Sequence, residues 1–391
     1  MILQRDRTIG LEHWRPNSVL ALFVGDFALL GIVVGAQGVL WASLMAALHI
    51  TKSAFGGALL TSPFMAVLLL LLGGHLSAMI GKKRMAVLSL FLMGIASLIL
   101  GAAGTLGGFL AALLVQGAGY GLFETAMNGA ALDWERATGR RMLNLVHGSF
   151  NGGAIVGALS AGAMLAAGWK PPGVLAAVAS LAGVMLVATL CVTYPRLGTQ
   201  TITDIPGATL RLMIGSKPLR VLSVIGALGA VGESVIFLWS VIYLRERGAS
   251  PMMGGLAFSL LSSAMMAGRL ANIGIVRRFG LKASFYVSGM GLLCSSILLL
   301  VSRGLAPAIL ALGLMGVSVA SVLPTVLTAG AAFAPKQTGA ISGGVLAAFY
   351  VGLMVTSPTV GVLADTFSLN VAFLVVGLSG LGISWLARKA T

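Results

Sequence analysis

The chain has 391 residues, of which 58% are hydrophobic and only 9% are charged, and its formal net charge is +15. Soluble domains average about 25% charged residues, so this composition argues strongly against a soluble enzyme. The two cysteines, Cys191 and Cys294, both lie in apolar runs, and they offer neither a disulfide framework nor a cysteine-based metal site. The sequence therefore predicts an all-α membrane protein that crosses the bilayer many times.

Apolar runs between helix breakers predict twelve transmembrane helices, because each helix needs about 20 residues. The polar stretch from Pro195 to Pro218 divides these helices into six plus six. We expect an N-terminal six-helix bundle with a cytoplasmic N-terminal segment (1–196), a cytoplasmic central loop (197–217) and a C-terminal six-helix bundle (218–391). The predicted spans are 17–47, 54–80, 85–104, 107–131, 142–168, 172–194, 219–244, 252–276, 283–302, 305–333, 339–364 and 369–387.

The lysines and arginines are distributed unevenly between the two sides of these spans. Of the 25, 19 fall on the side of the N-terminus, 5 on the other side, and Arg269 lies within a span. The positive-inside rule therefore predicts cytoplasmic N- and C-termini, in a protein of the plasma (cell inner) membrane. The same rule explains the net charge, so we expect no nucleic-acid partner. No short apolar core with a cleavage site follows the N-terminus, and we expect no removable signal peptide.

The first span carries three residues close to one helical face. Asp26 is followed by Gln37 and Trp41 after 11 and 15 residues, which are about three and four turns. Ionisable groups are costly inside a bilayer, so each one is a functional candidate. We treat Asp26 as a candidate for proton coupling, and Gln37 and Trp41 as candidates for contact with a solute.

Two basic hairpins occupy equivalent places in the two halves of the chain. The run 74–84, GHLSAMIGKKR, stands at the end of the second span, while Gly268-Arg269-Leu270 stands near the end of the eighth span and the run 277–282 follows it. Duplicated halves of this kind build one large class of transporters. We expect a cytoplasmic gating network from these segments and the end of the fourth span, although Arg269 could simply reach the interface or pair with a helix C-terminus. Its candidate members are Lys82, Arg84, Asp133, Arg269 and Arg277.

The fourth span contains the most pronounced polar stripe of the chain. Gln116, Tyr120, Glu124 and Asn128 are spaced by four residues, so they share one side of a helix, and a stripe this polar does not face lipid. A carboxyl group in such a place is suited to bind and release a proton, which makes Glu124 the first candidate for proton coupling. The other three are candidates for solute binding. The alternative is that Glu124 is a structural residue bonded to a neighbouring helix.

Asn144, His147 and Asn151 share one face of the fifth span, at i, i+3 and i+7. Amide and imidazole groups both donate and accept hydrogen bonds, which suits a hydroxyl-rich ligand, and His147 could also titrate. Hydrogen bonding between helices is the alternative for all three. Because no second histidine or acid stands at ligand spacing, we expect no metal site.

The seventh span adds a second membrane acid and two aromatic residues. Glu233 and Ser240 are seven residues apart and are expected on one face, with Trp239 and Tyr243 close by. Glu233 is a further candidate for proton coupling, and the other three are candidates for solute binding. Anchoring at the membrane interface is the alternative for Trp239 and Tyr243.

Taken together, the hairpins and stripes resemble the major facilitator superfamily over essentially the whole chain. The runs 124–128 (ETAMN) and 141–147, followed by 153–155 (GAI), resemble the fucose permease-like branch of sugar–proton symporters, as do 239–244 and Pro324 and Pro358. The resemblance implies a proton-coupling role for Glu124, a central cavity lined by the fourth span, and aromatic residues that stack on sugar rings.

The chain also departs from the family pattern at two places. Ala78 and Met79 stand where the family's first hairpin has Asp and Arg. The family's Asp belongs to a cytoplasmic charge network that holds the outward-open state. The resemblance therefore implies that the network here is weaker, or that it uses other partners such as Asp133, Glu135 and Arg136 near the end of the fourth span. The branch's acid in the first span would fall near Gly38, so Asp26 does not inherit its role and fucose itself is disfavoured.

These observations predict a secondary transporter that works by alternating access. We expect proton-coupled symport of a small polar, sugar-like solute by a monomer that uses no cofactor. Its partners are the small-molecule substrate (sugar-like or amphipathic), protons and the lipid bilayer. No G-x-x-x-x-G-K-[ST] loop is present, so ATP is not the expected driving force, and we expect no enzyme activity.

Two alternatives stay open at this point. One is a proton-driven exporter of a hydrophobic compound or lipid, although Gly157-Ala158 replaces the Gly-Pro pair that drug–proton antiporters carry in the fifth span. The other is a non-transporting membrane sensor or scaffold.

Overall fold

The computed structural model describes residues 15–140, 142–194, 211, 213–333 and 338–389, and the regular elements in these ranges are all helices. The first half of the chain forms α1 (Pro16–Ala47), α2 (Lys52–Leu59), α3 (Thr61–Ile80), α4 (Lys82–Ala102), α5 (Leu106–Thr138), α6 (Leu143–Ala166) and α7 (Pro171–Cys191). The second half forms α9 (Lys217–Ser234), η1 (Val235–Trp239), α10 (Ser240–Glu246), α11 (Pro251–Val301), α12 (Leu305–Val319), α13 (Val322–Phe333), α14 (Thr338–Thr366), α15 (Leu369–Ala372), α16 (Leu374–Leu386) and η3 (Ala387–Lys389).

Proline and glycine set many of the helix boundaries. Pro16, Pro171 and Pro251 each open a helix, where the missing N–H would have no partner inside the helix. Gly139 ends α5 in the left-handed conformation (φ 69°), and Gly81 turns the chain between α3 and α4 (φ 81°). The short connections between consecutive helices follow from these breaks.

Eleven helices in the described residues are long and apolar enough to cross a membrane. The difference from the predicted twelve comes from α11, which is 51 residues long and covers the predicted spans 252–276 and 283–302. Its backbone is non-helical at Gly280 (φ 81°, ψ 174°), between those two spans. Twelve spans, and the side on which the termini lie, stay predictions.

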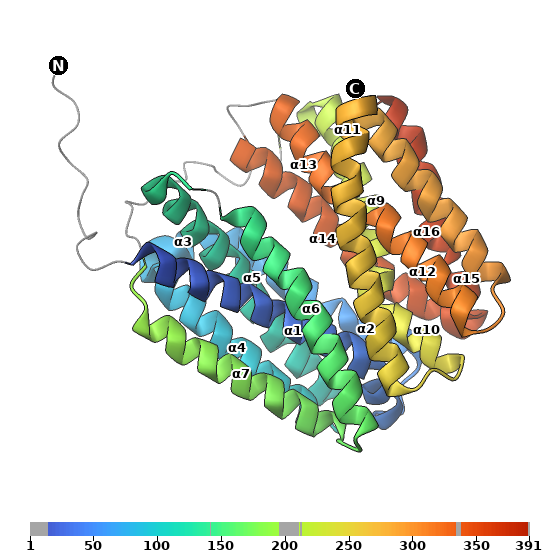
Figure 1. The fold of residues 1–391 in the computed structure, drawn as a ribbon, viewed down its shortest axis with the longest axis horizontal. Helices are drawn as coiled ribbons and strands as arrows, with labels where there is room; N and C mark the ends of the chain where they lie inside the picture. Colours follow the sequence, from blue (N-terminus) through green and yellow to red (C-terminus); the bar gives the residue numbers. More distant parts are fainter. Residues whose placement is uncertain (1–14, 141, 195–210, 212, 334–337, 390–391) are drawn as a thin grey trace.

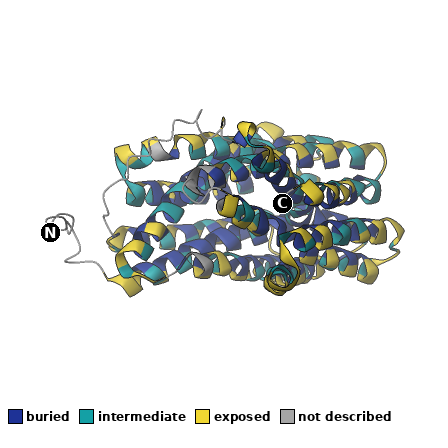
Figure 2. Ribbon diagram, turned by 90° about the horizontal axis from the view of Figure 1, so that it is seen from above, coloured by how far each residue is buried: buried dark blue, intermediate teal, exposed yellow. Residues whose placement is uncertain are grey.

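The outer surface of the helices is strongly apolar. Leu310 is 73% exposed and Leu378 is 67% exposed, and many other large apolar side chains are exposed with them. Figure 2 shows exposed residues on the outward faces of the helices and buried residues between them. A soluble monomer rarely exposes so much apolar surface, and a lipid environment accounts for it.

The helices form two groups in Figure 1, with α1 to α7 (blue to green) on one side and α9 to α16 (yellow to red) on the other. Within the first group α1 packs on α6, and α4 packs on α5 and α7; within the second, α11 packs on α12 and α16, and α9 packs on α14. The predicted boundaries at 196 and 218 stay a prediction, because most of the central loop lies outside the described residues.

Glycines allow α1 and α6 to touch backbone to backbone. A Cβ atom at Gly31 or Gly35 would lie 2.0 Å from a backbone carbonyl oxygen of α6, and one at Gly153 would lie 2.0 Å from the carbonyl oxygen of Ala28. Small residues permit such close packing in membranes. These glycines therefore serve contact between the two helices.

The two groups of helices meet at one end of the molecule, which we call the closed end. There α1 and α14 end, and α2 and α11 begin. Ser259 of α11 donates to the carbonyl oxygen of Ile155 in α6 (3.2 Å), and a Cβ at Gly38 would lie 2.4 Å from the ring of Phe258. The predicted topology puts this end on the outer side of the membrane.

Candidate functional site

A central cavity of about 260 Å³ lies between the two groups of helices. Both groups contribute to its wall, as the family resemblance predicts for a central cavity. From α1, α2, α3, α5 and α6 the lining residues are Leu30, Val34, Leu59, Ser62, Pro63, Ala66, Tyr120, Glu124 and Phe150. From α9, η1 and α14 they are Glu233, Ser234, Phe237, Leu238, Tyr350, Leu353 and Ser357.

Glu124 reaches the cavity from the middle of α5. Its Oε2 accepts a hydrogen bond from Asn128 Nδ2 at 2.6 Å, and the same nitrogen donates to the Glu124 carbonyl oxygen at 2.9 Å. Both residues are only partly exposed. Asn128 therefore holds the carboxylate from within the same helix, one turn away, as their spacing of four residues allows.

Gln37 and Gln116 form a reciprocal amide pair that joins α1 to α5. Gln37 Nε2 donates to Gln116 Oε1 at 3.0 Å, and Gln116 Nε2 donates to Gln37 Oε1 at 2.8 Å. Gln116 Nε2 also donates to the hydroxyl of Tyr120 at 2.8 Å. Both glutamines are buried, and neither is in the described lining of the cavity. Only Tyr120 of these three faces the space.

Glu233 enters the cavity from α9, on the opposite side from Glu124. Its Oε1 lies 3.9 Å from Nη2 of Arg269 in α11, and Nε of Arg269 donates to the carbonyl oxygen of Ala320 at 3.2 Å. Arg269 thus pairs with an acid within the second group of helices. At 3.9 Å and with Arg269 34% exposed, the pair is a loose one.

Two carboxyl groups therefore face one cavity from opposite halves of the protein. The described lining contains no lysine, arginine or histidine. Carboxyl groups in such a site can hold a proton or accept hydrogen bonds from a bound solute. No group of three or more His, Cys, Asp or Glu in the described residues could hold a metal ion.

The predicted polar face of α6 is only partly defined. His147 is exposed and its ring packs edge-on against Phe27 of α1, with 5.0 Å between centroids. Asn151 is buried and donates to the His147 carbonyl oxygen at 3.3 Å. The side chain of Asn144 lies outside the described residues. Neither His147 nor Asn151 is in the described lining of the cavity.

Three residues predicted for solute binding at the end of the seventh span are buried away from the cavity. Trp239 packs edge-on against Phe55 of α2, at 5.5 Å. Ser240 donates to the Ile236 carbonyl oxygen (2.5 Å), and Tyr243 hydrogen-bonds the Leu299 carbonyl oxygen (3.3 Å). Their complete burial argues against direct solute contact in this conformation.

The first span also places its predicted residues in the protein interior. Trp41 packs edge-on against Phe55 (5.7 Å) and Phe109 (6.2 Å). Asp26 is fully buried between helices, and neither carboxylate oxygen accepts a hydrogen bond from the described residues. The buried hydroxyl of Thr189 in α7 lies beside this carboxylate, but in the described residues it too makes no hydrogen bond of ordinary geometry. Asp26 is not in the described cavity lining.

The predicted gating residues do not form one network in this conformation. Lys82 forms an ion pair with Asp133 of α5 and donates to the carbonyl oxygen of Gly129 at 3.2 Å, all within the first group of helices. Arg84 and Arg277 are exposed. Arg269 is paired with Glu233 inside the second group.

Several cavity residues were not predicted from the sequence. The most prominent are Phe150, Phe237 and Tyr350, whose aromatic rings line the space, and Ser234 and Ser357, whose hydroxyl oxygens lie 3.2 Å apart across α9 and α14. Tyr350 and Ser357 are seven residues apart, so they share a helical face. This spacing of Tyr350 and Ser357 could have indicated a polar face on α14, but two polar residues in an otherwise apolar span give only a weak pattern.

The pattern of the Major Facilitator Superfamily matches residues 23–344. The chain belongs to this superfamily.

Two transporters are similar to this chain in sequence. The uncharacterized transporter y4wD of Sinorhizobium fredii is 28% identical over 366 residues, covering 92% of this chain and 95% of its own. An uncharacterized MFS-type transporter of Yersinia pestis is 30% identical over 297 residues, covering 72% of each chain.

Solved superfamily structures share the fold. A mutant of the nucleoside transporter NupG has a TM-score of 0.83 at 12% identity, covering 96% of this chain and 99% of its own. A D-xylose–proton symporter has a TM-score of 0.77 at 14% sequence identity, covering 96% of this chain and 98% of its own. A variant of the E. coli fucose–proton symporter FucP has a TM-score of 0.63 at 17% sequence identity, covering 95% of this chain and 98% of its own. The chain is thus a multi-pass membrane transporter, and its relatives and fold are those of transporters, which are not enzymes.

Proposed function

We propose that the protein is a proton-coupled symporter of a small polar, sugar-like solute, and that Glu124 carries the proton. The observation that carries this proposal is the pair of carboxyl groups, Glu124 and Glu233, that face one cavity from opposite halves. A group exposed to a cavity between two rocking halves can meet each side of the membrane in turn.

Glu124 suits proton exchange better than Glu233 does. Its described partner is the neutral Asn128, so gaining a proton breaks no ion pair. Protonation of Glu233 would instead release Arg269. Glu233 is therefore the second candidate for the proton carrier, and its protonation would be coupled to movement of Arg269. His147 and Asp26, which lie off the described cavity lining, rank below both.

The hydrogen-bonding groups of the cavity favour a solute rich in hydroxyl donors. Gln37 and Gln116 satisfy each other, and Asn128 is occupied by Glu124. The polar groups that the wall presents to a solute are the two carboxyl groups and the hydroxyls of Ser62, Tyr120, Ser234, Tyr350 and Ser357. Ionised carboxylates only accept, so a solute that binds them directly has to donate, while the serine and tyrosine hydroxyls can donate to it or accept from it. Aromatic rings in the wall add faces on which a sugar ring can stack.

The alternating-access scheme uses the predicted division of the chain. Residues 1–196 and 218–391 would rock against each other, joined by the loop 197–217, with both termini in the cytoplasm. The contacts at the closed end then seal the outer side, and the cavity is reached from the cytoplasm. We place the protein in the inner membrane, where superfamily transporters of bacteria typically act.

Proteoliposomes with a trapped pH dye test the proposal. A panel of sugars and sugar acids is added outside, and the wild type is expected to acidify the lumen with its cognate solute. Glu124→Gln should abolish this signal but retain solute counterflow, since a permanently neutral side chain imitates the loaded state.

Ser180→Ala is the control, because Ser180 is exposed on α7, lies off the described cavity lining, and donates its hydroxyl to the Ala176 carbonyl oxygen within its own helix at 2.9 Å. This variant should behave as wild type. Proton entry that is unchanged in Glu124→Gln would refute the assignment of the proton carrier. If Glu233→Gln alone abolished the signal, the role would pass to Glu233.

A second candidate function is proton-driven export of a hydrophobic compound or lipid. Nine of the sixteen described lining residues are apolar, from Leu30 to Leu353, and such a wall would suit an amphipathic cargo. Inside-out vesicles that accumulate a fluorescent amphiphile only when energised would favour this candidate. Vesicles that accumulate none while proton–sugar symport is measured would exclude it.

A further inference from the structure

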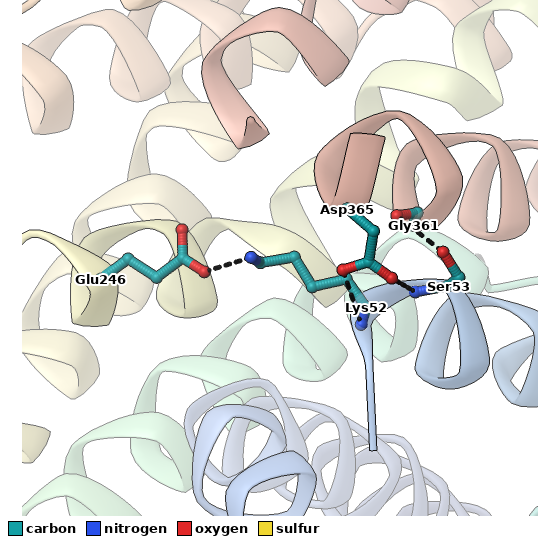
Figure 3. Close-up of polar contacts among 5 residues, drawn as sticks. All are labelled: Lys52, Ser53, Glu246, Gly361 and Asp365. Atoms are coloured by element: carbon teal, nitrogen blue, oxygen red, sulfur yellow. Dashed lines mark hydrogen bonds and ion pairs between the residues drawn. The ribbon is translucent and has the colours of Figure 1, made fainter. Parts of the chain in front are cut away.

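The closed end is held by a cluster of polar contacts between α2 and the second group of helices (Figure 3). Asp365, near the end of α14, accepts two backbone N–H bonds at the start of α2: Lys52 N to Oδ1 at 3.2 Å and Ser53 N to Oδ2 at 2.7 Å. Ser53 Oγ donates to the Gly361 carbonyl oxygen at 3.4 Å. Lys52 Nζ lies 2.8 Å from Glu246 Oε1 of α10.

Through these contacts, backbone N–H groups in the first turn of α2 find their hydrogen-bond acceptor in α14. The first N–H groups of a helix have no partner within it, and the helix dipole places partial positive charge there. Thr51 caps only the N–H of Ala54, at 3.1 Å. The N–H groups of Lys52 and Ser53 are left to the carboxylate of Asp365, which belongs to the opposite half.

The backbones at this contact are also unusually close. A Cβ at Gly361 would lie 2.3 Å from the Lys52 carbonyl oxygen, and a Cβ at Gly56 would lie 2.3 Å from the Ser357 carbonyl oxygen. The carboxylate therefore sits on a rigid surface, where both of its bonds form without rearrangement. Breaking the contact separates a charge from a helix N-terminus and leaves the two N–H donors to water.

The ion pairs and hydrogen bonds described at the opposite end are of another kind. The polar contacts found there stay within one half, as with Lys82 and Asp133. All described hydrogen bonds and ion pairs between the halves lie at the closed end: those of Lys52 and Ser53 with α10 and α14, and that of Ser259 with Ile155.

We propose that Asp365 and the start of α2 form a latch that sets the resting state of the transporter with the closed end shut. Opening that end requires loss of both carboxylate bonds and of the Lys52–Glu246 pair. The latch depends on the charge of Asp365 more than on its shape. Asp365 and Glu246 are both exposed, so solvent weakens both contacts; the Lys52–Glu246 pair contributes less because it joins two long side chains that lose conformational freedom, whereas Asp365 accepts from two fixed backbone N–H groups. The inference rests on the contact geometry and is independent of the transported solute.

The test measures distances by double electron–electron resonance in purified protein without solute. Cys191 and Cys294, both free and exposed, are first replaced by serine. One spin-label pair is placed at Lys170 and Arg303, in exposed connections at the closed end. A second pair is placed at Arg84 and Arg277, both exposed at the opposite end.

Asp365→Asn is expected to raise the ratio of molecules open at the closed end by about tenfold, since bonds to a charged group are the stronger class. The Lys170–Arg303 distances lengthen and the Arg84–Arg277 distances shorten together. Glu246→Gln should produce a smaller shift, and Asp365→Glu, which keeps the charge, should lie between Asp365→Asn and wild type.

Thr366→Val is the matched control, because Thr366 adjoins Asp365 and its hydroxyl donates to Val362 within α14 at 2.8 Å. It should leave both distributions unchanged. Wild-type distributions in Asp365→Asn would overturn the proposal, as would an equal shift in Thr366→Val. Broadening of both distances without the reciprocal change would show general loosening and would also count against a latch.

Discussion

The amide pair of Gln37 and Gln116 gives a prediction whose size follows from the structure. Two reciprocal bonds of 3.0 and 2.8 Å tie α1 to α5 in a buried place. Hydrogen bonds between membrane helices are worth about 0.6 kcal/mol on average and at most about 1.7 kcal/mol. The pair is therefore expected to contribute about 1.2 kcal/mol of coupling, with a ceiling of about 3.4 kcal/mol.

A double-mutant cycle of leucine substitutions measures this coupling. Gln37→Leu alone leaves Gln116 buried with unmet groups, at a cost of about 1–3 kcal/mol, and Gln116→Leu does the same to Gln37. The double variant replaces both amides by apolar side chains, so it should be more stable than the sum of the single effects indicates. The free energy of unfolding is measured in mixed detergent micelles by circular dichroism.

The cycle also decides the role of the two glutamines. Additive single effects, within about 0.5 kcal/mol, would show that the side chains do not act as a pair. The double variant should still exchange solute in a counterflow assay, because the described cavity lining contains neither residue. Loss of solute binding in a stably folded double variant would contradict this role and return both glutamines to the binding site.

Three further predictions concern stability and the second acid. Gly153→Ala should lower the free energy of unfolding by more than about 2 kcal/mol in the same assay, because its Cβ would lie 2.0 Å from the Ala28 carbonyl oxygen; wild-type stability would contradict the described packing. Asp26→Leu should raise the melting temperature, since a buried polar group without a partner costs about 1–3 kcal/mol, and a lower melting temperature would point to a bound partner. Arg269→Gln should be less stable than the double variant with Glu233→Gln, because removing one partner leaves the acid unpaired; the opposite order would show that the ion pair is unimportant.

The sequence predicted the membrane helices well, because twenty apolar residues and a breaker leave a clear signal. The first span was expected at 17–47 and α1 occupies Pro16–Ala47. The spacing of four between Tyr120 and Glu124 correctly placed both on one face, and they now line the cavity. The helical period depends only on the local chain, so it stays the same whichever element the helix packs against.

Partners across helices could not be predicted in the same way. Gln37 and Gln116 are 79 positions apart, and their periodicity shows only that each has a polar side, not that the two sides meet. The buried Asp26 illustrates the same limit, since its position in a span says that it is costly but not whether it faces the cavity.

The expectation that Glu233 and Ser240 share a face was drawn from the regular α-helical period. The turn η1 between them is a π-helix, which inserts an extra residue into the turn and rotates the start of α10 by about 100°. Glu233 and Phe237 line the cavity, while Trp239 and Ser240 are buried elsewhere. Nothing in the apolar run 235–239 marks the change of period in advance.

The backbone contact between α1 and α6 has a mechanical consequence. Without room to slide, the two helices move as one lever, which touches α11 at Gly38 and extends past the cavity wall at Leu30 and Phe150. From Gly38 to Pro16 is 22 residues, or about 33 Å of helix. A tilt of about 10° about the contact at Gly38 displaces the Pro16 end of α1 by about 6 Å. A small rearrangement at the closed end therefore produces an opening of that width at the opposite end.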